Sequence, residues 1–228
     1  MFDTDPDARP KPKPDFSSDF AYKFRAGRTV NKKPVSLATW RVTTGDPDVA
    51  QAVAGLLGGE VAEWETSKED NLEVITTSAT VRLVLDGPDA VESSLILWGR
   101  SGPIHECDGV SYLNPPEDAG TPCGCPPLLT ERKALHKAER GPGPHTKVTF
   151  RLADAPHLGK GQLVSGSWEL LKVLHELEND LDAVGAPALV ELDLELVQFT
   201  TTAGVDVAFR KPVFTVLGPA PLDGDAGE

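Results

Sequence analysis

Thiols and positive charge are both scarce in this 228-residue chain. Its three cysteines are far too few for a small secreted domain stapled by disulfides. It has 22 lysine and arginine residues against 35 aspartate and glutamate residues, which gives a formal net charge of −13. Because phosphate contacts dominate nucleic-acid affinity, this charge argues against non-specific binding to DNA or to an anionic membrane.

Long apolar runs are missing as well. No stretch approaches the roughly 18–20 apolar residues that a membrane-spanning helix needs. The opening "MFDTDPDARPKPKPD" lacks the apolar stretch of a signal peptide. We therefore expect a cytoplasmic protein with reduced cysteines and no membrane partner. In that compartment, grouped thiols serve more often as metal ligands or nucleophiles than as disulfides.

Glycine and proline, in contrast, are abundant, with 21 and 20 residues, and indicate many turns. Residues 1–15 are rich in proline, and a basic run begins among them at Arg9 and continues to Lys33, so we expect this N-terminal segment to be flexible. We expect a single domain over 16–218 and a disordered tail over 219–228. The rest of the chain is acidic, which is typical of a soluble protein; the alternative interpretation is a surface that binds a basic protein.

Helix and strand patterns follow one another irregularly along the chain, which favours an α+β fold with an antiparallel or mixed sheet and a few packed helices. Asp46 can cap a helix that Pro47 opens, and Ser167 can cap another with an apolar stripe. Alternating apolar residues predict strands, the last two in a hairpin with its turn at Thr201–Gly204. The expected helices cover 47–57, 126–140 and 168–184, and the expected strands lie within 39–43, 71–89, 93–100, 148–152 and 188–218.

All the cysteines fall in "HECDGV" (105–110) and "TPCGCP" (121–126). Zinc takes about four thiolate or imidazole ligands in a tetrahedron. Gly124 allows the Cys-x-Cys loop to fold back so that both thiols face one point. We therefore predict that a structural zinc ion, bound by Cys107, Cys123 and Cys125, clips an inserted loop over 105–145 onto the sheet; three free thiols are the alternative.

We expect a histidine to supply the fourth ligand. His145 is preferred, because it lies where the chain returns from the excursion to begin the next strand. His105 is the alternative, because it shares a strand face with Cys107 in an i, i+2 relation. His136 lies on a predicted helix and is harder to aim.

Sequence motifs for catalysis are weak. "HLGKGQ" lacks the spacing of a P-loop, "GVSYLN" is not a nucleophile elbow, and His175 has no second histidine in a His-Glu-x-x-His motif. We expect no catalytic residues and no organic cofactor, and an accessory protein rather than an enzyme. Two alternatives remain: a zinc-dependent hydrolase or nuclease with Glu106 or Asp108 as base, and a zinc-ribbon nucleic-acid binder that uses Arg132, Lys133, Lys137 and Arg140.

Several segments together resemble a known family. "WRVTTGDPDVAQAVAGLLGG", "LWGRSGPIHECDG", "CGCP", "VTFRLADAPHLGKGQLVSGSW" and the final hairpin are similar to the recombination directionality factors of actinobacterial temperate phages that use large serine integrases. The resemblance covers about Phe20 to Val216. Relatives often place a further cysteine near "GPGPH", and the resemblance implies that His145 replaces it here.

The resemblance also implies a function. Such a factor binds the phage integrase in the cytoplasm of the bacterial host and switches it from integration to excision. It meets DNA indirectly, through the integrase. An acidic protein without a catalytic motif is compatible with this role.

Overall fold

Most of the chain is described by the computed structural model. The expected flexible segment 1–15 lies outside the described residues, as does 222–228 of the expected tail. Pro219 still lies in the last strand, and the amide of the buried Ala220 donates to the carbonyl oxygen of Pro187 at 2.9 Å. The described residues are 20–30, 33–66, 69–185, 187–201, 204 and 206–221.

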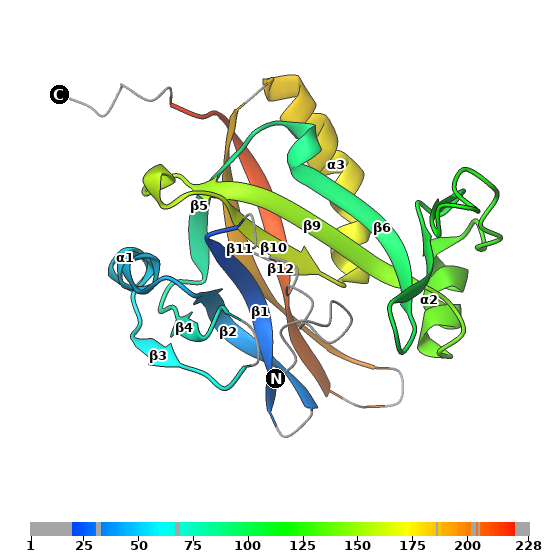
Figure 1. Ribbon diagram of the computed structural model, residues 1–228, viewed down its shortest axis with the longest axis horizontal. Coiled ribbons are helices and arrows are strands. Elements are labelled where there is room, and N and C mark those ends of the chain that lie inside the picture. Colours follow the sequence, from blue (N-terminus) through cyan, green and yellow to red (C-terminus); the bar gives the residue numbers. More distant parts are fainter. Residues whose placement is uncertain are drawn as a thin grey trace, which may run out of the picture.

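Twelve strands and three α-helices make up the described fold (Figure 1). The helices are α1 (Pro47–Leu57), α2 (Leu129–Lys137) and α3 (Trp168–Val184), with single 3₁₀ turns at Pro88–Ala90 and Pro156–Leu158. The strands are β1 (Tyr22–Val30), β2 (Lys33–Thr44), β3 (Val61–Glu63), β4 (Leu72–Ile75), β5 (Thr80–Leu85), β6 (Val91–Trp98), β7 (Pro103–Cys107), β8 (Tyr112–Asn114), β9 (Gly143–Leu152), β10 (Gly161–Ser165), β11 (Ala188–Thr200) and β12 (Asp206–Pro219).

The strands pair into one mixed sheet, as an α+β fold with an antiparallel or mixed sheet requires. The main path runs β12-β11-β5-β9-β10-β1-β2-β4-β3, and β6, β7 and β8 branch from β9. β1 and β10 pair in parallel. All the other strand pairs among the described residues are antiparallel.

Local capping defines two helices where the sequence predicted them. The Asp46 carboxylate accepts from the backbone amides of Asp48 and Val49 at the start of α1. The Ser167 hydroxyl accepts from the amide of Leu170 at the start of α3. α2 is shorter than the predicted 126–140 and buries none of its residues. Among the described residues, no helix is both long and apolar enough to cross a membrane.

One large hydrophobic cluster fills the body of the molecule. The ring of Phe24 meets Phe150 edge-on at 5.4 Å between centroids and packs against Trp40 at 5.6 Å. The apolar stripe of α3, which includes Leu174 and Leu181, lies fully within this cluster. Burial of these side chains is the main stabilising contribution in this part of the fold.

The predicted C-terminal hairpin is present as β11 and β12. Residues 188–193 of β11 pair with β5 on one side and with β12 on the other. Beyond Asp193, β11 pairs with β12 alone, and its side chains are mostly exposed. The end of the hairpin therefore extends past β5 (Figure 1).

The cysteine segment forms a separate lobe at one end of β6 and β9. We call residues 99–142, which contain β7, β8 and α2, the cysteine lobe. Figure 1 shows it set apart from α1 and from the middle of the sheet. β7 pairs with β6, and β8 pairs with β7, so the lobe continues the sheet rather than hanging from it as an irregular loop.

Candidate metal centre

β7 places His105 and Cys107 on one face of the lobe. In the register of β6 and β7, His105 lies opposite Leu97 and Cys107 lies opposite Leu95. Residues two apart in a strand share a face, so both side chains point the same way. Cys107 is fully buried and packs with Leu95.

Two turns bring the other cysteines to this face. The Asp108 carboxylate accepts from the amides of Val110 and Ser111, each at 2.7 Å, and Gly109 has a φ of 95°. The amide of Cys123 then donates to the carbonyl of Val110 at 2.9 Å. Gly124 has a φ of 70°, a conformation that favours glycine. The loop reverses there, as the sequence predicted, and returns Cys125 toward Cys107.

Four potential ligand atoms converge as a result. One atom from each of His105, Cys107, Cys123 and Cys125 lies within 4.8 Å of all the others. The Sγ atoms of Cys107 and Cys125 are 3.8 Å apart, and Sγ of Cys125 is 3.6 Å from Nε2 of His105. A tetrahedral zinc ion, with zinc–sulfur bonds of about 2.3 Å and zinc–nitrogen bonds of about 2.0 Å, requires separations of about 3.8 and 3.5 Å. The cluster could hold a metal ion without rearrangement of these pairs.

The protonation of the cluster depends on its burial. Burial raises the pKa of the Cys107 and Cys125 thiols. Burial lowers the pKa of His105, which favours the neutral imidazole that a metal ion needs. A bound divalent cation would stabilise the thiolates and reverse the effect of burial on the cysteines.

Arg132 connects α2 to the metal-binding loops. Its Nε donates to the carbonyl oxygen of Pro126 at 2.5 Å, and its Nη2 donates to the carbonyl oxygen of Gly109 at 2.7 Å. The two carbonyls belong to the two turns that carry the cysteines. Arg132, one of the basic residues considered for nucleic-acid binding, therefore has a structural role.

His145, the fourth ligand preferred from the sequence, is not brought to the cluster. Cys107 lies opposite Leu95 on β6, and Leu95 lies opposite Pro144 on β9. His145 is one residue further along β9 and so faces the other side of the sheet. Its ring packs edge-on against Trp98, with 5.9 Å between the centroids.

The other nearby polar residues also have partners away from the cysteines. The imidazole of His136 packs on Trp168, with ring centroids 5.8 Å apart. The Glu106 carboxylate accepts from the hydroxyl of Ser94 at 3.2 Å, on the face opposite Cys107. Asp108 is held in its turn. Neither acidic residue considered as a general base is therefore aimed at the cluster.

Comparison with known proteins gives the chain its family. No solved structure matches it. The sequence model of the Gp3-like family, described as recombination directionality factor-like, matches residues 18–217, a span close to that of the resemblance seen in the sequence. The chain belongs to the Gp3-like family of recombination directionality factor-like proteins.

Proposed function

We propose that this protein is a recombination directionality factor that binds a phage large serine integrase and switches it from integration to excision. The observation that carries this proposal is the family match over residues 18–217. The protein is then a regulator, which works by binding one arrangement of the integrase more tightly than another.

The lobe metal is, in this proposal, a structural zinc ion. His105, Cys107, Cys123 and Cys125 together supply four ligands, which is the full set of a closed structural site. A catalytic zinc ion would keep one position open for water and would need a general base nearby. The arrangement supports His105 as fourth ligand in place of His145, and it favours a regulator over a hydrolase.

The junction of β6 with the lobe also offers a surface for the integrase. Trp98 is 60% exposed and Ile104 is 62% exposed, and both lie at the turn between β6 and β7. Exposed tryptophan is enriched among the residues that dominate binding energy at protein interfaces. We assign these side chains to the integrase contact, with the zinc ion holding the strands that carry them.

The net charge of −13 supports a protein partner. A DNA-bound recombinase presents basic surface, and opposite charge accelerates and orients association. Contact with DNA is then indirect, through the integrase, in the cytoplasm of the bacterial host.

A reconstituted recombination reaction tests the proposal. The integrase encoded in the same phage or prophage genome is incubated with a plasmid that carries the two hybrid attachment sites, with and without this protein. We expect excision product only when the protein is present, and co-elution of the two proteins in gel filtration. If excision is unchanged and the proteins elute separately, the proposal is wrong.

Two matched variants test the assigned surface. Ile104→Asp should weaken co-elution and excision, because it puts a charge in an apolar contact. Val173→Asp makes the same kind of change at a 46% exposed position on α3 and should leave both readouts unchanged. Equal effects of the two variants would contradict the assignment of the surface to β6 and β7.

A further inference from the structure

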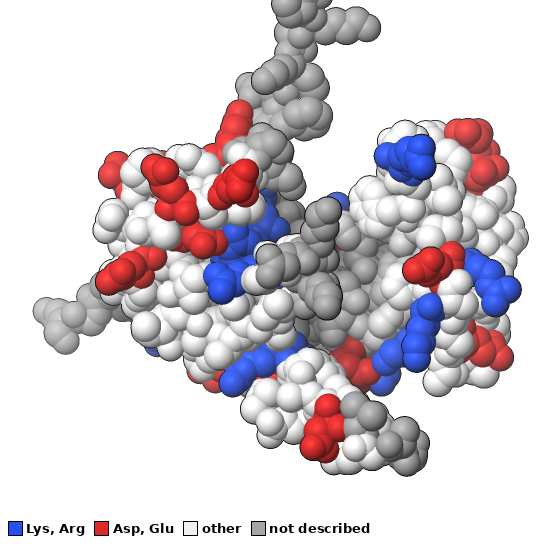
Figure 2. All heavy atoms as spheres, turned by 90° about the horizontal axis from the view of Figure 1, so that it is seen from below, with Lys and Arg blue, Asp and Glu red and all other residues white. Residues whose placement is uncertain are grey.

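Basic side chains meet on one face of the β1–β2 pair, in a protein that is otherwise acidic. Arg25 lies directly opposite Arg41 in the register of the two strands. The neighbouring residues Phe24 and Val42 point into the core, so both arginines lie on the outer face of the sheet. Figure 2 shows basic side chains gathered near the middle of one face of the molecule.

Directly opposed like charges are destabilising in a sheet, and nearby groups offset only part of the charge. Arg41 pairs with Glu73 at 2.5 Å and stacks over the ring of Trp64 at 4.3 Å. Asp70 lies 3.4 Å from Arg25 and 4.0 Å from Lys23. No carboxylate among the described residues pairs with Arg28. Four basic groups against two acidic groups leave a local charge of 4 − 2 = +2.

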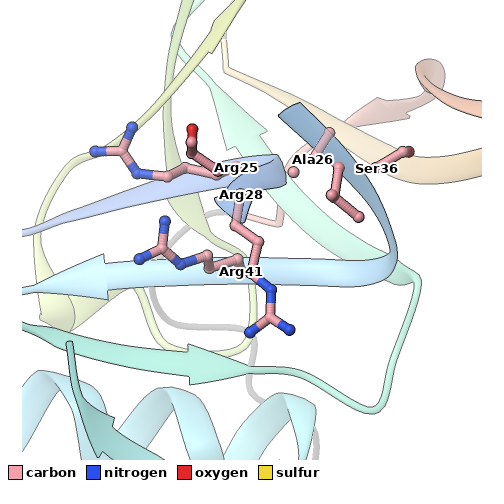
Figure 3. Close-up of a pocket in the computed structure, with 8 residues that line it drawn as sticks. Arg25, Ala26, Arg28, Ser36 and Arg41 are labelled. Carbon is pink, nitrogen blue, oxygen red and sulfur yellow. The ribbon is translucent and has the colours of Figure 1, made fainter. Parts of the chain in front are cut away.

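The two strands also part at this point and open a pocket. Between the pairs Arg25–Arg41 and Gly27–Ser36, β1 has one residue, Ala26, whereas β2 has the four residues 37–40. The resulting bulge borders an open depression of about 520 Å³. Figure 3 shows Arg25 and Arg28 leaving β1 and Arg41 leaving β2 around this opening.

Gly27 allows the strands to approach on the far side of the pocket. A Cβ atom at this position would lie 2.7 Å from the carbonyl oxygen of Val35, closer than packed atoms approach. Closely spaced backbone at Gly27 and Val35 and the three arginines thus line the same pocket. It belongs to the main sheet, away from the cysteine lobe (Figure 1).

We propose that this pocket binds a carboxylate side chain on an acidic segment of a protein partner. The guanidinium fork of arginine matches a carboxylate in two parallel hydrogen bonds. Arg28 makes the first contact, because it is exposed and pairs with no carboxylate of the described residues. Arg25 and Arg41, held in place by Asp70 and Glu73, supply the fixed positive charge behind it.

Charge favours a protein segment over DNA as the occupant. Duplex DNA carries about one negative charge per 1.7 Å along its axis. A body of net charge −13 would repel that continuous charge on both sides of the pocket. A short acidic loop brings few charges and can enter the depression without placing others over the acidic surroundings.

A peptide-binding measurement tests the pocket without any integrase. The probe is a dye-labelled peptide of alternating glutamate and glycine, titrated with the full-length protein at low salt and followed by fluorescence anisotropy. Arg28→Glu should weaken binding about tenfold or more, because it removes a charge-assisted hydrogen bond and adds repulsion. Arg28→Gln should lie between this variant and the wild type.

Arg100→Glu is the matched control. It makes the same change of net charge at another exposed arginine, in the turn between β6 and β7, and should leave the affinity nearly unchanged. Thermal unfolding establishes that the variants are folded. Equal weakening by the two charge reversals, or no saturable binding of the peptide, overturns the proposal. A DNA duplex of matched charge serves as a second probe. If it binds more tightly than the peptide, and if Arg28→Glu weakens its binding, the pocket is a phosphate site and the proposal is wrong.

Discussion

The body of the sheet and the cysteine lobe are joined through β6 and β9 but bury very different amounts of apolar surface. Among the described residues, the cluster in the body contains 27 buried residues, whereas the cluster at the lobe contains Cys107, Cys123 and Leu95 of the adjoining strand β6. α3 buries four leucines and α2 buries no residue. A segment with so small a core needs another source of stability, as small domains with cross-links do. We expect the body to be stabilised by its apolar core, and the lobe to be stabilised by a metal ion that its cysteines bind.

Removal of the metal ligands should produce the largest effect, and it should be confined to the lobe. In the double variant Cys123→Ser, Cys125→Ser, two of the four ligands are lost, and structural zinc contributes on the order of 10 kcal/mol in small metal-dependent domains. We expect the purified protein to lose its zinc and amide protection to collapse over residues 103–142. Amide hydrogen exchange and metal analysis measure both.

The body provides the internal control for that experiment. Amides of β5, β9 and β11 should keep the protection that they have in the wild type, since their core does not include the lobe. If zinc content and exchange in the lobe are unchanged in the double variant, the metal clip does not exist. If the body loses protection together with the lobe, the two regions fold as one unit and the contrast between them is wrong.

Substitution of the histidine ligand should produce the next largest effect, on zinc affinity. His105→Ala removes a ligand atom that lies 3.6 Å from Sγ of Cys125, and the zinc affinity should fall by a factor of about 100 or more. His145→Ala removes a ring that packs on Trp98, and the zinc affinity should be unchanged. Competition with a chromogenic chelator measures both affinities, and the opposite ranking would restore His145 as the ligand.

This contrast shows what the sequence could and could not specify about the site. Proximity in sequence to the three cysteines could not separate His105 from His145, because the decision depends on strand register. One row across β7, β6 and β9 contains Cys107, Leu95 and Pro144, so His145, the next residue in β9, faces the other side of the sheet. That register depends on the pairing of β6 with β9, two strands that are far apart along the chain. A shift of one residue in the pairing of β6 with β9 would bring His145 to the face of Cys107, whereas His105 shares that face in any register.

The fold shows the same division between local and non-local information. The spans of α1 and α3 were predicted because their caps and apolar spacing are local signals. β1 was missed because the alternation of apolar and charged residues in "YKFRAGRTV" lasts only from Tyr22 to Arg25 and ends at Ala26 and Gly27. The strands β8 and β10 were missed because three and five residues are too few to show a strand pattern. For β7 the sequence placed His105 and Cys107 on one strand face, but not the pairing of that strand with β6. The pocket at Arg25, Arg28 and Arg41 needed the bulge between β1 and β2, which no local pattern encodes.

A substitution in the core of the body should lower the stability of the body and leave the zinc content unchanged, which is the opposite of the result expected for the metal ligands. Leu181→Ala removes a fully buried side chain of α3, and the free energy of unfolding should fall by about 2–5 kcal/mol. Val173→Ala on the exposed side of the same helix should change it by less than about 1 kcal/mol. Chemical denaturation measures both values. Zinc content should be normal in each variant, and loss of zinc in Leu181→Ala would show that the lobe depends on the body.

The smallest effect should come from a buried hydroxyl in the body, and its size should depend on pH. The Tyr22 hydroxyl donates to the carbonyl of Gly159 at 3.3 Å and accepts from the amide of Leu152 at 3.1 Å. Tyr22→Phe leaves that amide without its partner, which should cost about 1–2 kcal/mol at neutral pH. Burial raises the pKa of Tyr22 from 10.0 to about 12.

The sign of the pH dependence follows from that raised pKa. Between pH 10 and 12 the unfolded chain loses the Tyr22 proton while the folded chain keeps it, so the unfolded state binds fewer protons and stability falls as pH rises. The advantage of the wild type over Tyr22→Phe should therefore be complete below pH 10 and shrink as pH rises toward 12. Urea denaturation of the two proteins at matched pH values measures the difference in their free energies of unfolding. Lysines titrate in the same pH range, but both proteins contain them, so their contribution cancels. A difference in stability that stays constant across this pH range would mean that burial does not raise the pKa of Tyr22. The core of the body would then be more open to water around Tyr22 than the contrast with the lobe implies.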